Sequence, residues 1–497
     1  MNIGIEIEPK VLYTDRVNKC KIVILNNTRD HLSEFAITVS DEGRNLLILE
    51  AKTLKPSGSI SREVDIKVSE KYPREIEVRS LDVNLIYELT DGQNREENLK
   101  LEGYYILPEN DPYIAQGIPT NSSFQGRETF YADLKESFSG VAALFLDAPG
   151  CFGKTSFLRN ISRQPYFEHT SIVFLDAGIG NAAVDISNKD LDDLDEFSKQ
   201  LAQVVFETSQ DRKSQMDLRP FLKKVNKDLS KQDKNLLIIV DGIEGWLESA
   251  QKNPTELVGL HKIRNIFRDE DPDDYKNIKW IFSGSWSLNP DLSAIWSEHL
   301  SGYRIHSTRR FSTLDNQTGR RVVTIPVKGL VEFEEDALDR IGYYTGWHPH
   351  LIQILCDGIY KELLNRGGNP PWAVDDDLVN LATNRHEVIN SVNNVWGRTL
   401  ASFKGANIVL SILAAIKSLP NAQATENQIL NMIAAGPLIS REDLSNITKF
   451  LDLPYNAVIS QILPEIIKYL FDLGLINLVD SNPQRYQLSA GLFARYF

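Results

Sequence analysis

Hydrophobic and polar residues alternate in short runs through the first part of the chain. Residues 3–7 and 81–85 are two such runs, and turn residues at 26–27 and 91–92 interrupt the pattern. Period-two alternation is typical of strands that bury one face. About seven short strands in roughly 100 residues predict an all-β sandwich of the immunoglobulin type over 1–107.

The pattern changes after a polar, proline-containing connector at 108–113. Beyond it, fully apolar runs alternate with helix-like segments, which indicates a parallel sheet covered by helices. The strand candidates are the four apolar runs at 142–146, 171–175, 236–240 and 278–282. We therefore predict an α/β core with a parallel sheet over 108–328.

From about residue 329 the pattern becomes helical. Amphipathic segments at 334–344 and 349–366 predict an all-α lid over 329–401. In the last part, 402–497, helices are expected near 406–417, 426–434, 441–451 and 455–473. A β-hairpin at 475–488 follows them, and this combination resembles a winged helix.

Composition narrows the classes of function. The chain has 54 basic and 68 acidic residues and a formal net charge of -14, which argues against general attraction to nucleic acid or anionic lipid. Three scattered cysteines give neither a disulfide framework nor a zinc site, so we expect a reducing, cytoplasmic location. The start of the chain lacks a signal-peptide pattern, and the longest aliphatic run, 236–240, is far shorter than a membrane span.

The sharpest motif directly follows the strand expected at 142–146. It has the spacing of a phosphate-binding loop, with alanine in place of the usual first glycine, and it leads into a helix-like segment. Its residues are Ala148, Pro149, Gly150, Cys151, Phe152, Gly153, Lys154, Thr155 and, at the start of the helix, Ser156. Glycines let successive backbone N–H groups face a polyphosphate. We expect Lys154 to contact the β- and γ-phosphates of ATP and the Thr155 hydroxyl to bind Mg²⁺.

Acidic and hydroxyl residues end two further strands. Asp241 follows the run at 236–240 and is expected to hold the Mg²⁺ with Thr155. Glu244 is placed to polarise an attacking water, and Ser283, after the run at 278–282, to sense the γ-phosphate. The alternative for Asp241 and Ser283 is an ordinary turn at the end of a strand.

The order of these motifs resembles the STAND-type P-loop ATPases, the AAA-like signal-transduction ATPases of bacterial and archaeal conflict systems. Segments at 110–113, 117–119 and 124–128 resemble the part of that family that precedes the P-loop. The stretch 345–356 is similar to the Gly-x-Pro segment of its helical lid. The resemblance covers about 108–497, including the terminal winged helix.

The resemblance implies further contacts with the nucleotide. Phe124, Gly126 and Arg127 would line the adenine and ribose side, and Pro349 would touch the nucleotide from the lid. His348 would approach the phosphates in a closed lid, whereas His350 is more simply read as a helix-start residue without a ligand.

One departure from the family concerns arginine. The strand at 278–282 ends in Ser-Gly-Ser where several relatives have an arginine, so a γ-phosphate sensor must come from elsewhere. The candidates are Arg304, Arg309 and Arg310 downstream and Arg264 and Arg268 upstream, with surface charge as the alternative. Because such an arginine contributes about 10³–10⁵ in rate, we expect hydrolysis to be slow without one.

Two functions are compatible with these features. The first is an ATP-dependent molecular switch with slow ATPase activity, which acts in prokaryotic antiviral defence or signalling and forms oligomers when activated. In that case protein partners would dock on 1–107, where Cys20 and His31 give no catalytic cluster. The second is a DNA-handling ATPase, a loader or transposition regulator that uses its winged helix. Equal numbers of basic and acidic residues in 402–497 favour the switch.

Overall fold

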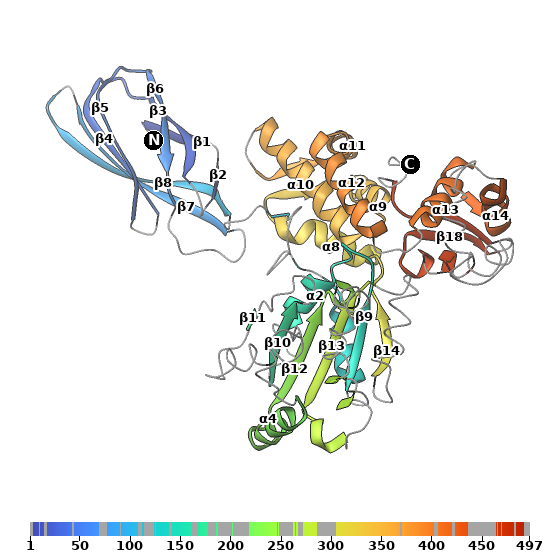
Figure 1. The fold of residues 1–497 in the computed structure, drawn as a ribbon. Coiled ribbons are helices and arrows are strands. Elements are labelled where there is room, and N and C mark those ends of the chain that lie inside the picture. Colours follow the sequence, from blue (N-terminus) through green and yellow to red (C-terminus); the bar gives the residue numbers. More distant parts are fainter. Residues whose placement is uncertain are drawn as a thin grey trace. The chain divides into compact units, whose positions relative to one another are not determined.

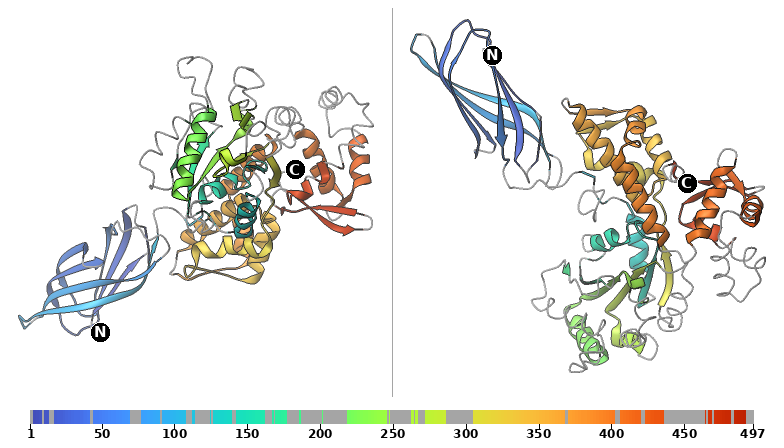
Figure 2. Two further views of the ribbon diagram at one scale, coloured as in Figure 1. Left: turned by 90° about the horizontal axis from the view of Figure 1, so that it is seen from below. Right: turned by 45° about the horizontal axis from the view of Figure 1, so that its top comes forward.

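The structure is a computed structural model, shown in Figure 1 and, from two further sides, in Figure 2. It describes residues 3–8, 10–13, 17–41, 44–68, 77–89, 91–107, 112–113, 124, 126–138, 142–161, 167, 169–176, 185–186, 201, 218–245, 247, 262–263, 265–266, 272–285, 305–367, 370–401, 406–419, 423–435, 464, 466–468, 470–481 and 484–491. The chain divides into two compact units. The first comprises Met1–Gln125, Arg320–Ile341 and Ile352–Val388, and the second comprises Gly126–Gly319, Gly342–Leu351 and Ile389–Phe497.

Two β-sheets make up the start of the first unit. Strands β1 (Ile3–Glu8), β3 (Asn18–Asn26) and β6 (Ser59–Ile66) form an antiparallel sheet in the order β1-β3-β6. The other sheet has the order β2-β8-β7-β4-β5. Its strands are β2 (Val11–Tyr13), β4 (Leu32–Asp41), β5 (Arg44–Leu54), β7 (Glu77–Leu89) and β8 (Asn94–Leu107). Of these, only β2 runs parallel to its neighbour, β8.

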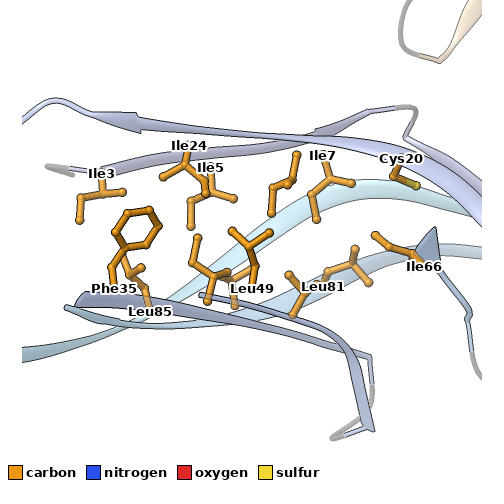
Figure 3. Close-up of a cluster of buried hydrophobic side chains, with 14 of the residues drawn as sticks. Ile3, Ile5, Ile7, Cys20, Ile24, Phe35, Leu49, Ile66, Leu81 and Leu85 are labelled. Carbon is orange, nitrogen blue, oxygen red and sulfur yellow. The ribbon is translucent and has the colours of Figure 1, made fainter. Parts of the chain in front are cut away.

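The alternation in the sequence builds the core between these sheets. Along β1, Ile3, Ile5 and Ile7 are buried and the residues between them are more exposed. Their side chains meet those of the other sheet, such as Phe35 and Leu81, in one hydrophobic cluster (Figure 3). The described part of this region therefore has eight strands around one core, where the sequence predicts about seven.

The lid segment is mostly helical, with one difference from the prediction. Its helices are α9 (Glu335–Thr345), α10 (Pro349–Arg366), α11 (Asp376–Ala382) and α12 (His386–Ala401), and α8 (Asn316–Thr324) precedes the segment. Two short strands, β15 (Val331–Phe333) and β16 (Trp372–Val374), also pair in parallel, so the segment is not all-α. Three-residue strands are too short for period-two alternation to reveal them.

A parallel sheet forms the centre of the second unit. Its order is β11-β10-β12-β13-β9-β14, and all neighbours are parallel except the short edge strand β11. The strands are β9 (Ala143–Asp147), β10 (Thr170–Asp176), β11 (Asp185–Ile186), β12 (Asn235–Asp241), β13 (Ile278–Gly284) and β14 (Ile305–Arg310). Helices α1 (Glu128–Ser137), α2 (Lys154–Asn160) and α4 (Leu218–Gln232) accompany them.

The four predicted core strands are confirmed as β9, β10, β12 and β13. Every residue of β9 is buried, as expected for a strand covered on both faces. The sequence predicts no strand at β14, whose residues are mostly polar and which lies at the edge of the sheet. Parallel strands place their carboxyl ends at one edge of a sheet, so the residues that follow β9, β12 and β13 come together.

The last part of the chain contains helices α13 (Ala406–Ser418) and α14 (Glu426–Ala435) and a small antiparallel sheet. The sheet has the order β17-β19-β18, from β17 (Gln423–Thr425), β18 (Ile476–Ser481) and β19 (Gln484–Leu488). The predicted hairpin is thus present with one additional strand. The helix expected at 441–451 lies outside the described residues, as does most of the one expected at 455–473. Among the described helices, none has the length and apolar composition of a membrane span.

Candidate phosphate-binding site

The loop between β9 and α2 has the conformation that its sequence favours. Cys151 and Gly153 have positive φ angles of 71° and 85°, so the chain turns through the left-handed region twice before α2 begins at Lys154. Glycine adopts this conformation at little cost, whereas cysteine is strained in it. The Ala148 N–H donates to the Gly284 carbonyl, 3.2 Å away, which fixes the loop to the end of β13.

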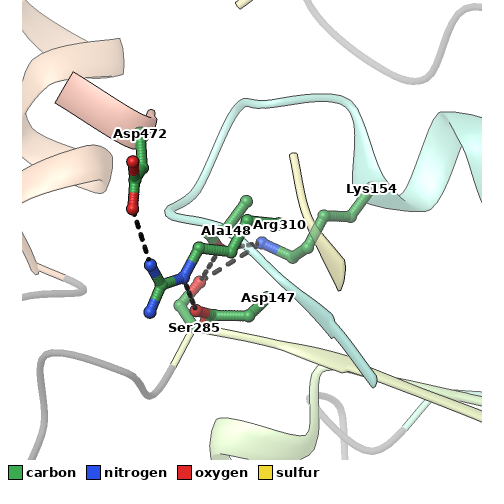
Figure 4. Close-up of polar contacts among 6 residues, drawn as sticks. All are labelled: Asp147, Ala148, Lys154, Ser285, Arg310 and Asp472. Atoms are coloured by element: carbon green, nitrogen blue, oxygen red, sulfur yellow. Dashed lines mark hydrogen bonds and ion pairs between the residues drawn. The ribbon is translucent and has the colours of Figure 1, made fainter. Parts of the chain in front are cut away.

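Lys154 turns back onto the loop that precedes it (Figure 4). Its buried Nζ donates to the carbonyl oxygen of Ala148, to that of Pro149 at 3.0 Å and to the Ser285 Oγ at 3.2 Å. The Ser285 hydroxyl in turn donates to the Ala148 carbonyl. The ammonium group is therefore held beside the first residues of the loop by three uncharged oxygen atoms.

Thr155, on the helix that follows β9, meets Asp241, which ends β12, although β9 and β12 are not neighbours in the sheet. β13 separates β9 from β12, yet the Thr155 Oγ1 donates a hydrogen bond to the Asp241 Oδ2 at a distance of 2.5 Å. A hydroxyl and a carboxylate are hard oxygen donors of the kind Mg²⁺ prefers, and such sites use one or two protein ligands beside phosphate oxygens. The pair therefore fits Mg²⁺. No group of three or more His, Cys, Asp or Glu side chains in the described ranges has the arrangement of an all-protein metal site.

Glu244 and Ser283 lie in the same region with buried polar atoms. The Glu244 Oε2 and the Ser283 Oγ are both buried and have no hydrogen-bond partner among the described residues. Burial raises the pKa of Glu244, with Asp241 adding to the rise and Lys154 opposing it. A carboxylate with a raised pKa is a stronger base, which suits the activation of water.

The residues expected on the base and ribose side lie around α1. A Cβ on Gly126, which has φ +89°, would be within 2.2 Å of the Thr318 Cγ2, so only glycine fits there. The Arg127 guanidinium lies 4.3 Å from the centre of the Phe311 ring and donates to the Ser312 carbonyl at 2.6 Å. Burial lowers the pKa of Arg127 to about 10. Phe124 is half-buried.

The turn between α9 and α10 reaches the loop. The His348 ring packs edge-on against Phe152, with 4.5 Å between ring centres, and a Cβ on Gly153 would lie 3.9 Å from the Pro349 Cγ. Burial, together with the nearby His350 and Arg127, lowers the pKa of His348 to about 3. In this arrangement His348 is therefore neutral and contributes packing rather than positive charge.

The candidate arginines are placed differently from one another. Arg309 donates to the Ser137 Oγ at 3.2 Å, and Arg310 contacts Asp147 and Asp472. Arg264, Arg268 and Arg304 lie outside the described residues.

Two parts of the site were not predicted. Ser285 follows the predicted Ser283 by two residues, and only the hydrogen bonds of Lys154 reveal its role. Trp347 is the second. Its ring packs directly against two glycines, since a Cβ would lie 2.2 Å from the ring if added to Gly319 and 2.5 Å from it if added to Gly342. Glycines at 319 and 342 in helix-like segments are the signal that could have indicated such a close approach.

Comparisons with known proteins assign neither a family nor a function. No protein-family model matches the chain, and neither does any curated protein. Among solved structures, it is similar to the Walker-type ATPase PABY2304 of Pyrococcus abyssi, with 14% identity and a TM-score of 0.45, over 76% of this chain and 97% of that one. It is also similar to the ORC2 protein of Aeropyrum pernix in its ADPNP-ADP complexes, with 13% identity and a TM-score of 0.37, over 77% of this chain and 93% of that one. The ADP form of ORC2 gives 12% identity and a TM-score of 0.38, over 75% and 92%. Similarity this low assigns no family.

Proposed function

We propose that the chain binds ATP with Mg²⁺ at the loop from Ala148 to Ser156 and acts as a nucleotide-dependent switch. The observation that carries this proposal is the 2.5 Å contact between Thr155 and Asp241. Thr155 lies on α2, which follows β9, and Asp241 ends β12; β13 separates these two strands, and a turn at the end of a strand does not by itself require the two residues to meet. Their convergence beside a lysine at the head of a helix is the arrangement that phosphate and Mg²⁺ require.

Each residue of the loop would have a distinct part in binding. Lys154 would exchange its three neutral acceptors for phosphate oxygens, a charge-assisted contact that is stronger than a bond to a carbonyl. The N-terminus of α2 would add backbone N–H groups and its positive dipole end. Thr155 and Asp241 would hold the Mg²⁺, which neutralises charge on the phosphates when bound.

Slow hydrolysis is part of the proposal. Glu244 would accept a hydrogen bond from the attacking water, and the buried Ser283 hydroxyl would donate to a γ-phosphate oxygen. Both have a buried polar atom that finds no partner in the described part of the chain, as expected for groups that await a ligand. The contacts described for the candidates Arg309 and Arg310 are with Ser137, Asp147 and Asp472. We assign neither to the γ-phosphate and expect slow turnover, because an arginine there contributes about 10³–10⁵ in rate.

The remaining features support a switch that works through other proteins. The turn with His348 and Pro349 packs on the loop, so nucleotide binding would shift this turn between α9 and α10. We propose a STAND-like division into a sandwich at 1–107, a core at 108–328, a lid at 329–401 and a winged helix at 402–497. The order of β8, β7 and β4 in one sheet and of β3 and β6 in the other supports an immunoglobulin-type sandwich. Partner docking on that sandwich, self-association on activation, a cytoplasmic location and a role in prokaryotic antiviral defence or signalling complete the proposal.

Matched substitutions at Thr155 test nucleotide binding. Thr155→Val removes the hydroxyl, so it should weaken ATP binding at least tenfold in Mg²⁺ and much less in EDTA, measured by isothermal titration calorimetry. Thr155→Ser keeps the hydroxyl and should preserve the Mg²⁺ dependence. Lys154→Ala should abolish binding in both buffers, whereas Lys227→Ala, an exposed lysine on α4, should leave it unchanged. Unchanged ATP affinity in Lys154→Ala would refute the proposal.

A further inference from the structure

Arg310 lies between two carboxylates at the end of β14. It is in register with Asp147 of the neighbouring strand β9, and its Nε lies 3.9 Å from the Asp147 Oδ2. Its Nη1 donates to the Asp472 Oδ2 at 3.0 Å, from the end of the helical segment that precedes β18. Figure 4 shows the guanidinium between the two carboxylates. Asp147 is fully buried, while the Arg310 and Asp472 side chains are 41% and 31% exposed.

A close backbone contact joins the same two segments. The Thr313 N–H donates to the Leu473 carbonyl at 3.1 Å. A Cβ on Gly474, which has φ +72°, would lie 2.1 Å from the Thr313 Oγ1, so the segments approach as closely as a glycine allows. We call the contact of 310–313 with 472–474 the docking seam.

The docking seam adjoins the phosphate-binding loop. Asp147 immediately precedes Ala148, whose carbonyl accepts hydrogen bonds from Lys154 and Ser285. Arg310 thus contacts the first residue before the loop on one side and the winged-helix segment on the other. A half-exposed arginine of this kind can change partners without a large cost of desolvation.

We propose that bound phosphate competes with Asp472 for the Arg310 guanidinium, so that nucleotide binding loosens the docking seam. This inference rests on the proposed function. Phosphates in the loop add negative charge on the Asp147 side of Arg310 and leave the Asp472 side unchanged. The guanidinium is then attracted more strongly toward the loop, and its bond to Asp472 weakens. By thermodynamic reciprocity, loss of Asp472 strengthens nucleotide binding by the same factor.

A double-mutant cycle tests this competition. Asp472→Asn should tighten the binding of ATP with Mg²⁺ by about two- to fivefold, the range expected for one exposed ion pair. The same substitution in an Arg310→Gln background should have no effect, because the shared cation is gone. Asp228→Asn, which breaks the 2.8 Å pair with Lys231 on α4, is the matched control and should leave ATP affinity unchanged. Asp472→Glu should restore wild-type affinity in large part.

Hydrogen exchange at the Thr313 amide gives a second readout, since this N–H donates across the docking seam. ATP with Mg²⁺ should speed its exchange in the wild-type protein and have no further effect in Asp472→Asn, where exchange is already fast. If wild-type protein binds ATP while Asp472→Asn changes neither affinity nor exchange, or changes affinity equally without Arg310, the competition is refuted and the proposed function stands. Failure of the wild-type protein to bind ATP would instead refute the proposed function and, with it, the competition.

Discussion

Substitution of Gly319 by alanine tests whether the turn on the phosphate-binding loop is held by Trp347. An alanine Cβ at 319 would lie 2.2 Å from the Trp347 Cε3 and 2.5 Å from its Cδ2, well inside contact distance. The other edge of the ring lies against Gly342, where an added Cβ would lie 2.5 Å from the Trp347 Cζ2. Trp347 also has a positive φ of 55°, and its carbonyl accepts from the Leu314 N–H at 3.0 Å.

The magnitude follows from two opposing effects. Overpacking of a tight site costs about 1–3 kcal/mol. Alanine is favoured over glycine within a helix by roughly 1 kcal/mol, which offsets part of that cost. We expect Gly319→Ala to lower the free energy of unfolding by up to about 2 kcal/mol. Because Trp347 immediately precedes His348 and Pro349, the displaced turn should also weaken ATP binding several-fold.

Thermal unfolding and ATP titration measure these two effects separately. Gln317→Ala on an exposed position of α8 is the control and should change neither quantity. Combining Gly319→Ala with Trp347→Phe should recover part of the loss, since the smaller ring makes room for the Cβ. Equal stability and equal ATP affinity in Gly319→Ala and the wild-type protein would show that the ring does not position the turn.

Three further predictions concern single side chains. Burial lowers the pKa of His348 to about 3, against an ordinary 6.5, so the unfolded chain takes up a proton at this residue at higher pH than the folded chain. Stability should therefore fall as pH drops from about 6.5 toward 3, by up to about 1.4 kcal/mol per pH unit. His348→Phe should remove this part of the pH dependence in acid unfolding experiments. Asp375 accepts from the Leu378 N–H at 2.8 Å as the N-cap of α11, so Asp375→Ala should cost roughly 1 kcal/mol in thermal unfolding, and Asp375→Asn much less. Ser285→Ala removes one acceptor of Lys154 and should tighten ATP binding two- to fivefold in calorimetry; weaker binding would mean that the Ser285 hydroxyl contacts phosphate itself.

The strands of the core could be predicted where burial alone decides them. β9, β12 and β13 lie inside the sheet, so both faces need apolar side chains and the sequence shows continuous apolar runs. β14 lies at the edge, where polar residues such as Arg309 and Arg310 are compatible with a strand. β15 and β16 have three residues each, and their pairing joins segments about 40 residues apart, which no local pattern reports.

The site divides in the same way. Lys154, Thr155 and Asp241 could be predicted because phosphate and Mg²⁺ require particular residue types at fixed spacing in the chain. The contact between Thr155 and Asp241 agrees with that expectation. Ser285 acts through a hydrogen bond, and Trp347 through packing, with residues distant in sequence. Their roles therefore could not be predicted without the fold.

Three separate elements contact different parts of the loop. Ser285, after β13, holds Lys154; the turn before α10 packs on Phe152 and Gly153; and Arg310 of β14 contacts Asp147 at the base of the loop. The three N–H donors of Lys154 already have three oxygen acceptors, so phosphate cannot gain Lys154 without displacing at least one of them. Since Ser285 and Lys154 share the carbonyl of Ala148, that change occurs next to the residue that Arg310 contacts. A ligand at the loop would therefore act first on the end of β9, which Arg310 of β14 links to the docking seam.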